Sequence, residues 1–209
     1  MIKKTILIAL VTISFFLIGF TKEEAVKILE GKNIKVSEES FAAAYENQDP
    51  KAMALLLDAG IDPNIKLRGD MYFTHIMFYI SLGDPLDRRL ADYRRVALKM
   101  LDKGMNVNPK GDFVPLLTAA NAAWPEMVQA LIKKGADVNS IDSNGCTPLI
   151  AAIQKNNVNI VKILLAAGAK KEGSIKREKD GKTKVIPFKK IVQEMNNEKL
   201  EQLLFPPKR

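Results

Sequence analysis

His75 and Cys146 are the only histidine and the only cysteine of the chain, and their side chains have the most versatile chemistry. An imidazole exchanges a proton near neutral pH, and a thiolate attacks electrophiles. A catalytic base also needs a nucleophile and an orienting partner, and the sequence around His75 indicates neither. Cys146 has no cationic neighbour in sequence that would activate it. We therefore expect a structural role for His75 and a free Cys146, whose remaining option is an intermolecular disulfide.

The same counts exclude several classes of site. One cysteine cannot form an internal disulfide or a cysteine-based zinc site, and one histidine cannot form a multi-histidine metal site. Asp137, Asp142 and Asn144 have the residue types of a calcium loop, but the D-x-[DN]-x-[DN]-G order is missing, so they are interpreted as turn formers. The sequence also lacks a phosphate-binding glycine loop, a nucleophile elbow and an H-E-x-x-H motif. We predict a protein that is not an enzyme and holds no metal or cofactor.

Charge is concentrated at the two ends of the chain. The 209 residues include 32 Lys and Arg against 24 Asp and Glu, a net charge of +8. Lys3 and Lys4 contribute +2 and residues 170–209 contribute +6, so residues 21–169 are neutral on balance. Overall basicity is therefore a weak argument for nucleic-acid binding, and no nucleic-acid partner is expected.

Residues 1–20 are typical of an export segment. Lys3 and Lys4 are followed by an uncharged, mostly apolar run from Thr5 to Phe20, which predicts a secretory signal peptide. Sixteen helical residues would span roughly 24 Å, less than the ~30 Å of a bilayer core, which favours a cleaved signal. No A-x-A cleavage site is present, so an uncleaved membrane anchor is the alternative. We expect a periplasmic or secreted protein, with inner-membrane anchoring as the alternative.

The rest of the chain contains a repeat of about 33 residues. Glycines that follow apolar stretches recur at intervals of 44, 31 and 33 residues, at positions 60, 104, 135 and 168. Prolines give an independent marker, because Pro148 lies 33 residues after Pro115 and 39 residues before Pro187.

These segments resemble the ankyrin repeat family. Residues 142–152 (DSNGCTPLIAA) resemble the family's turn and first helix, and residues 161–169 (VKILLAAGA) resemble its second helix and terminating glycine. The preceding repeat matches through residues 115–120 (PLLTAA) and 135–139 (GADVN), and earlier repeats match more weakly. His75 falls where the family has a structural histidine. The resemblance implies an all-α solenoid of stacked helix-turn-helix units with short hairpin loops.

The physical pattern leads to the same domain organisation. Each apolar-faced stretch is too short to be stable alone, so neighbouring units must stack to bury it. Residues 21–36 begin with the capping-box sequence Thr21-Lys-Glu-Glu24 and are expected to form an N-terminal capping helix. Residues 37–204 form about four repeats and a polar C-terminal capping unit, and residues 205–209 are a tail.

Two insertions interrupt the period. The first, near residues 79–92, is expected to lengthen the first helix by about two residues and the second by about nine, with Asp84 and Pro85 starting the second helix. The second, at residues 170–184, holds seven basic and three acidic residues and predicts a long hairpin or loop. Such a loop is either a soluble tip or a contact for an anionic surface such as phospholipid head groups.

The resemblance implies protein binding through the hairpin tips and the concave face of the first helices. The candidate contacts lie in the hairpins, and Phe113 is the preferred aromatic anchor; they are Lys66, Arg68, Asp70, Lys110, Asp112, Phe113, Ser140, Asp142 and Asn144. We expect a monomer that binds a protein partner outside the cytoplasm. The alternatives are a membrane-tethered scaffold held by residues 1–20 and the basic loop, and an inhibitor or immunity-type protein with one tight partner.

Overall fold

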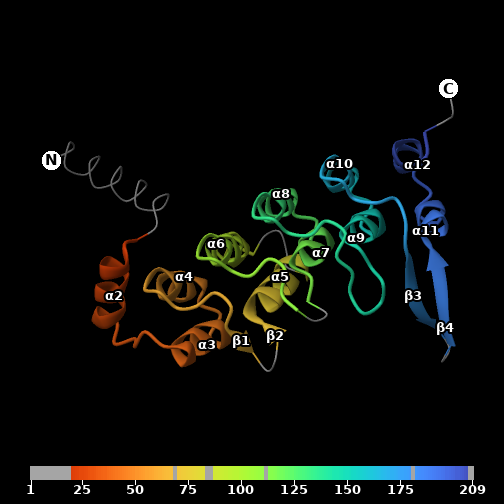
Figure 1. Ribbon diagram of the computed structural model, residues 1–209. Helices are drawn as coiled ribbons and strands as arrows, with labels where there is room; N and C mark the ends of the chain where they lie inside the picture. The colour runs from red at the N-terminus through yellow and green to blue at the C-terminus, as the bar shows by residue number, and fades with distance from the viewer. Residues whose placement is uncertain (1–19, 68–69, 83–86, 111–112, 180–181, 207–209) are drawn as a thin grey trace.

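The computed structural model describes residues 20–67, 70–82, 87–110, 113–179 and 182–206. Within these ranges, antiparallel helix pairs stack side by side along one direction and form an elongated solenoid (Figure 1). The predicted export segment, residues 1–20, lies outside the described residues except for Phe20. Among the described residues, no helix is long and apolar enough to span a bilayer.

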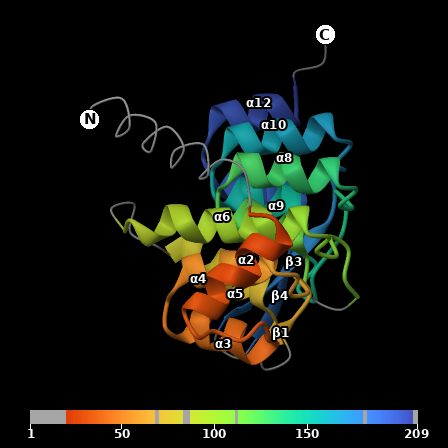
Figure 2. The same ribbon diagram turned by 90° about the vertical axis from the view of Figure 1, so that its left-hand side faces the viewer.

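The helices form two parallel layers (Figures 1 and 2). The inner layer carries the first helix of each pair: α3 (Glu38–Glu46), α5 (Tyr72–Leu82), α7 (Pro115–Asn121), α9 (Pro148–Gln154) and α11 (Phe188–Glu194). The outer layer carries the second helix: α4 (Pro50–Asp58), α6 (Arg89–Asp102), α8 (Pro125–Lys133), α10 (Val158–Ala166) and α12 (Glu198–Leu204). Contacts within each pair connect the two layers, as between α7 and α8, and contacts between neighbouring pairs join helices of the same layer, as between α7 and α9 and between α4 and α6.

Local sequence signals explain where these helices begin and end. The Asp49 side chain accepts the backbone N–H groups of Lys51 and Ala52, and Pro50 occupies the first helical position of α4. The glycines that follow the outer helices have positive φ angles, from 87° at Gly135 to 104° at Gly60, where a Cβ would be strained. The predicted glycine stops are therefore present.

The N-terminal helix α2 (Lys22–Gly31) packs against α4. Its predicted capping box is formed: the Thr21 hydroxyl accepts the Glu24 N–H, and the Glu24 carboxylate accepts the Thr21 N–H. Ala25 and Leu29 are fully buried, so α2 covers the apolar edge of the first helix pair.

The first insertion is divided between its two helices more evenly than the sequence predicts. Helix α5 has 11 residues and α6 has 14, against 7 in α7 and 9 in α8. The predicted start of the second helix at Pro85 is wrong, because α6 begins at Arg89. Arg88 is the N-cap of α6, and Asp87, just before it, accepts the N–H of Arg89; Asp84, the predicted N-cap, lies outside the described residues.

Hairpins project from the edge of the solenoid next to the inner helices (Figure 1). Strands β1 (Lys66–Leu67) and β2 (Asp70–Met71) form a short antiparallel pair before α5. The second insertion forms a longer antiparallel pair, β3 (Ser174–Lys179) and β4 (Lys182–Pro187), before α11. The fold is therefore mostly helical, and the long hairpin predicted at the second insertion is present.

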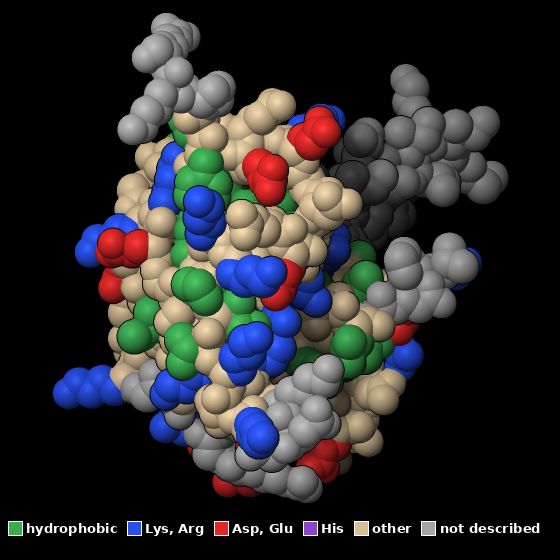
Figure 3. Space-filling view, turned by 90° about the vertical axis from the view of Figure 1, so that its right-hand side faces the viewer, with side chains coloured by type: hydrophobic (Ala, Val, Ile, Leu, Met, Phe, Trp, Pro, Cys, Tyr) green, Lys and Arg blue, Asp and Glu red, His purple; other side chains and the backbone are tan. Residues whose placement is uncertain are grey.

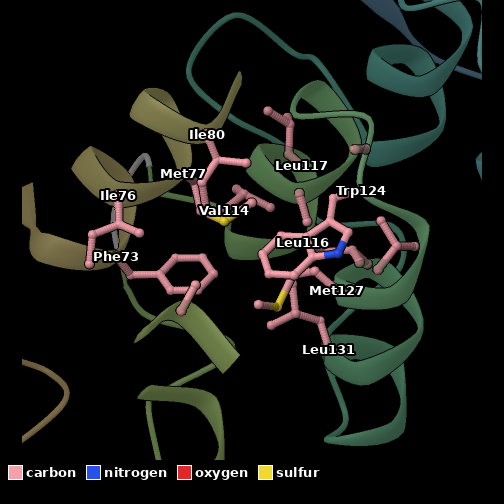
Figure 4. Packing of buried hydrophobic residues seen from close by; sticks show 14 of the residues in the cluster. Phe73, Ile76, Met77, Ile80, Val114, Leu116, Leu117, Trp124, Met127 and Leu131 are labelled. Atoms are coloured by element: carbon pink, nitrogen blue, oxygen red, sulfur yellow. The ribbon is translucent and has the colours of Figure 1, made fainter. Parts of the chain in front are cut away.

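One continuous apolar core runs between the two helix layers. In its centre Phe73, Met77 and Ile80 of α5 face residues of the next repeat, among them Leu116 and Met127 (Figure 4). Trp124 belongs to this core: the residue is 5% exposed, and the Arg94 guanidinium lies 5.4 Å from the centroid of its ring. Trp124 therefore packs on the repeat before it.

Candidate protein-interaction surface

Hydrogen bonds from asparagine side chains fix successive hairpins to one another. The Asn64 Oδ1 accepts the Asn106 N–H at 2.7 Å, and the Asn108 Oδ1 accepts the Asp137 N–H at 2.9 Å. The Asn139 Oδ1 accepts the Lys170 N–H at 2.9 Å in the same way. The hairpins therefore form a connected edge on which side chains have fixed relative positions.

The amide nitrogens of two of these residues add a second contact. Asn108 Nδ2 donates to the Gly135 carbonyl at 2.8 Å, and Asn139 Nδ2 donates to the Gly168 carbonyl at 3.4 Å. Within a loop, the Asp137 carboxylate accepts the Asn139 N–H at 2.9 Å and so holds the turn. Asp137 is thus the turn former that the sequence predicts.

The predicted contact residues are spread along this edge. Lys66, Lys110 and Asn144 have exposed side chains, whereas Ser140 and Asp142 are half-buried. Asp142 Oδ1 accepts the backbone N–H groups of Asn144 and Cys146 at 2.9 and 2.8 Å, and Ser140 Oγ donates to the Asp137 carbonyl at 2.8 Å. These two side chains therefore hold the hairpin in shape. Of the other hairpin candidates, Asp70 lies in β2, and Arg68 and Asp112 lie outside the described residues.

Phe113 occupies a different position from the exposed anchor that the sequence suggests. Its side chain is half-buried, and its ring packs edge-to-face on Phe73 with the centroids 6.1 Å apart. Removing this ring would therefore weaken the core beneath the hairpin as well as any contact above it.

The apolar side chains that the structure exposes most lie elsewhere. Phe78 is 62% exposed and Leu82 is 71% exposed, and both belong to α5, one turn apart. Ile141, in the loop before α9, is also 62% exposed. Outer helices cover one side of the inner helices, and the exposure of Phe78 and Leu82 shows that they lie on a part of α5 that no outer helix covers.

Phe78 occupies a position that is polar in the following repeats. It comes directly after the buried pair Ile76 and Met77; the residues that follow the matching buried pairs in α7, α9 and α11 are Asn121, Gln154 and Gln193. Leu82 lies in the extra turn that the insertion adds to α5. Sequence reasoning missed both residues, although the sequence of α5 (YFTHIMFYISL) contains a signal: it has more apolar residues than one buried face requires.

The residues with catalytic potential are not assembled into a reactive site. The Nε2 of His75 and the Oγ1 of Thr74 are enclosed and have no hydrogen-bond partner among the described residues, and the His75 ring lies 6.1 Å from the ring of Tyr45. Burial, with a smaller effect from the Asp142 charge, raises the pKa of Cys146 to about 12, so its thiol is protonated at neutral pH. The described residues also contain no cluster of three or more His, Cys, Asp or Glu side chains that could hold a metal ion.

A polar network joins the insertion to the first helix pair. Arg89 and the Tyr79 hydroxyl both donate hydrogen bonds to Asp87, and Arg89 also donates to the Gln48 side chain. The bonds from Arg89, then that from Tyr79, lower the pKa of Asp87 to about 2. The Asp87 carboxylate in turn raises the pKa of Tyr79. This network holds the start of α6 over the first repeat.

Comparison with known proteins agrees with this repeat geometry. The family model for ankyrin repeats (3 copies) matches residues 88–174, which run from the start of α6 to the start of β3. A fowlpox virus (strain NVSL) protein described as an ankyrin repeat protein is 57% identical over 44 residues. The mouse B-cell lymphoma 3 protein homolog is 40% identical over 55 residues, and the Caenorhabditis elegans ankyrin repeat and KH domain-containing protein mask-1 is 34% identical over 64 residues.

These similarities cover only part of each protein. The matched segments cover 21%, 26% and 31% of this chain and only 10%, 12% and 2% of the three proteins. Residues 88–174 of the chain are therefore ankyrin repeats. Ankyrin repeats are a protein–protein interaction module, and the family is generally non-enzymatic.

Proposed function

We propose that the protein binds a protein partner through the open side of its inner helices and its hairpin tips, without catalysis. The observation that carries the proposal is the exposure of Phe78 and Leu82 on α5, at 62% and 71%. Neighbouring exposed apolar side chains form a patch of the kind that marks protein interaction sites. The asparagine-linked hairpins supply a second, polar contact region in which side chains have fixed relative positions.

A pair of surface variants tests this function. In Phe78→Ser and Leu82→Ser the apolar anchors are lost, while the buried residues Ile76, Met77 and Ile80 of the same helix stay in place. We expect the thermal unfolding midpoint to change little and affinity for the partner to fall by about tenfold or more, because hot-spot truncation costs about 2 kcal/mol.

The matched control is Leu98→Ser, which exposes a polar group on the outer helix α6, where Leu98 is partly exposed. This variant should bind normally. Equal loss of binding in Leu98→Ser and Phe78→Ser, or undiminished binding in Phe78→Ser, would contradict the proposed surface. The partner for this assay is obtained by affinity capture with the folded protein and identified by mass spectrometry.

We also propose that this binding takes place outside the cytoplasm. The support is the sequence of residues 1–20, with Lys3 and Lys4 ahead of a continuous run without charged residues. N-terminal sequencing of the protein recovered from periplasmic or secreted fractions should find a processed chain that starts near Thr21. A chain that keeps Met1 and sediments with membranes would instead support the tethered scaffold.

A further inference from the structure

Strand β4 has one edge that no other described segment covers. It pairs with β3 along its whole length, from Ser174↔Pro187 to Lys179↔Lys182, and the sheet has only these two strands. The far edge of β3 is occupied, because the Lys176 N–H donates to the Asn144 carbonyl at 2.9 Å. The open edge of β4 lies at the C-terminal end of the solenoid (Figure 1).

The register determines which backbone groups this edge presents. Because the Lys176 N–H points away from β4, the pair Lys176↔Val185 is a non-hydrogen-bonded pair of the ladder. Such pairs alternate along antiparallel strands, so Thr183, opposite Glu178, has the same orientation as Val185. The N–H and C=O groups of Thr183 and Val185 therefore point outward. Pro187, which has no N–H, occupies the next outward position, so the row of outward N–H donors ends before it.

The side chains around this edge are basic. Lys182 and Lys184 of β4 and Lys189 and Lys190 of α11 are exposed, and within the described residues none of them forms an ion pair. Residues 170–190 contain nine Lys and Arg against three Asp and Glu. In the view of this end, Lys and Arg side chains gather across its middle with apolar side chains among them (Figure 3). Val185, which follows Lys184 on β4, is 58% exposed.

We propose that this edge binds an extended, acidic peptide segment of a partner protein as an added antiparallel strand. The backbone groups of Thr183 and Val185 supply the ladder hydrogen bonds, as in other cases of strand addition. Successive side chains of β4 point to opposite faces, so Lys182 and Lys184 share one face while Thr183 and Val185 share the other. The segment that fits carries Asp or Glu at alternate positions, facing the lysines, and β-branched residues between them, facing Thr183 and Val185.

Charge selects this occupant over a second copy of the chain. Pairing β4 with β4 of another molecule would bring Lys182 and Lys184 against the same two lysines, and like charges on facing strands are destabilising. The same lysines discourage neutral and basic strands from adding to the edge. This site is separate from the inner-helix surface that contains Phe78. The two proposals can therefore fail independently of each other.

The test measures binding of the capped peptide Glu-Val-Glu-Thr-Glu to the full chain by isothermal titration calorimetry. Two protein variants and one peptide variant separate charge from backbone pairing. Lys182→Gln together with Lys184→Gln removes the facing charges, and Val185→Pro removes an outward N–H that the β3–β4 ladder does not use. A peptide methylated on its alternate backbone nitrogens keeps its charge and cannot form the ladder. Lys162→Gln, on the exposed side of α10, is the matched charge control.

We expect the double lysine variant to bind the peptide about tenfold more weakly, and Val185→Pro and the methylated peptide to show no binding. Lys162→Gln and Phe78→Ser should bind it as the native chain does. Equal binding of the methylated peptide would overturn the proposal, since simple charge attraction would then suffice. So would binding to phosphatidylserine vesicles without binding to the peptide, or a dimer in sedimentation that Val185→Pro dissociates. Circular dichroism verifies that each variant is folded.

Discussion

Asn64, Asn108 and Asn139 hold matching positions in successive hairpins, and each accepts a backbone N–H from the next repeat. Their side chains connect neighbouring units outside the apolar core. Hydrophobic stacking brings the helix pairs together without specifying their exact register, because it has no direction. Directed hydrogen bonds between hairpins supply that register, and so they define the geometry of the proposed binding edge.

The first prediction concerns Asn108. Asn108→Ala removes the bond to the Asp137 N–H and the bond to the Gly135 carbonyl, and so should lower the free energy of unfolding by about 1–2 kcal/mol. Urea titration measures this difference. Asn144→Ala is the control. The hydrogen bonds of Asn144 in the hairpin come from its backbone N–H and C=O groups, which the substitution keeps. Equal effects of the two substitutions would show that the inter-repeat bonds add no stability.

The second prediction concerns the pH dependence of the Asp87 network. The folded pKa of Asp87 is about 2, below its ordinary value of 3.8, so its contribution to stability is complete above about pH 5 and is lost as the pH falls through 3.8 toward 2. The difference in unfolding free energy between the native chain and Asp87→Asn should therefore be constant from neutral pH to about pH 5 and shrink below pH 4. A difference that stays constant down to pH 2 would contradict the assignment.

At the scale of elements, helices α4 and α6 are joined by a buried carboxylate. Asp58 of α4 is 4% exposed and forms ion pairs with Lys99 of α6 and, at 3.3 Å, with Lys103, the residue that follows α6. The two lysines are one helical turn apart and converge on a single acceptor. This contact connects the first repeat to the inserted one, where the repeat period is most disturbed.

The third prediction follows from that contact. The side chain of Lys99 is 15% exposed, and Asp58→Ala leaves its ammonium group without a counter-charge. We therefore expect a loss of about 2–4 kcal/mol in unfolding free energy. Asp102→Ala, at the end of α6, is the matched control and should change stability by less than about 0.5 kcal/mol. A loss for Asp58→Ala no larger than that of the control would contradict the structural role of the ion pairs.

The fourth prediction tests how the β3–β4 hairpin is attached. At Gly145 (φ 78°) a Cβ would lie 2.7 Å from the Ser174 carbonyl oxygen, whereas at Gly104 (φ 95°) it would meet nothing within 4 Å. Both Ala substitutions incur the cost of a positive φ, about 1–2 kcal/mol, but only Gly145→Ala should also displace β3. Hydrogen exchange at the Lys176 N–H should therefore accelerate in Gly145→Ala and stay unchanged in Gly104→Ala. Equal rates in the two variants would show that β3 does not depend on this close approach.

At the scale of the whole molecule, the sequence was sufficient for the features that repeat. The glycine and proline intervals predicted the helix pairs, and Gly60, Gly104, Gly135 and Gly168 have the positive φ angles expected after helices. These features could be predicted because each depends on a local backbone requirement. The capping box at Thr21 is local in the same sense.

The features that sequence reasoning missed depend on contacts between distant residues. The start of α6 at Arg89 follows from the bonds of Asp87 to Arg89 and to Tyr79 in the preceding helix. Phe113 is half-buried because Phe73, forty residues earlier, lies beneath it. Phe78 and Leu82 are exposed because the neighbouring repeats leave that side of α5 uncovered. An apolar residue in a helix does not reveal by itself which of its neighbours will cover it.

The most direct test of the proposed binding surface is site-specific photo-cross-linking from α5. The photoreactive residue p-benzoylphenylalanine replaces Phe78 in one protein and Leu98, on the outer helix α6, in another, and both are irradiated in extracts of the source cells. The account predicts one dominant cross-linked protein from position 78 and its absence from position 98. No cross-link from position 78, or the same pattern from both positions, would contradict the claim that the open side of the inner helices binds the partner.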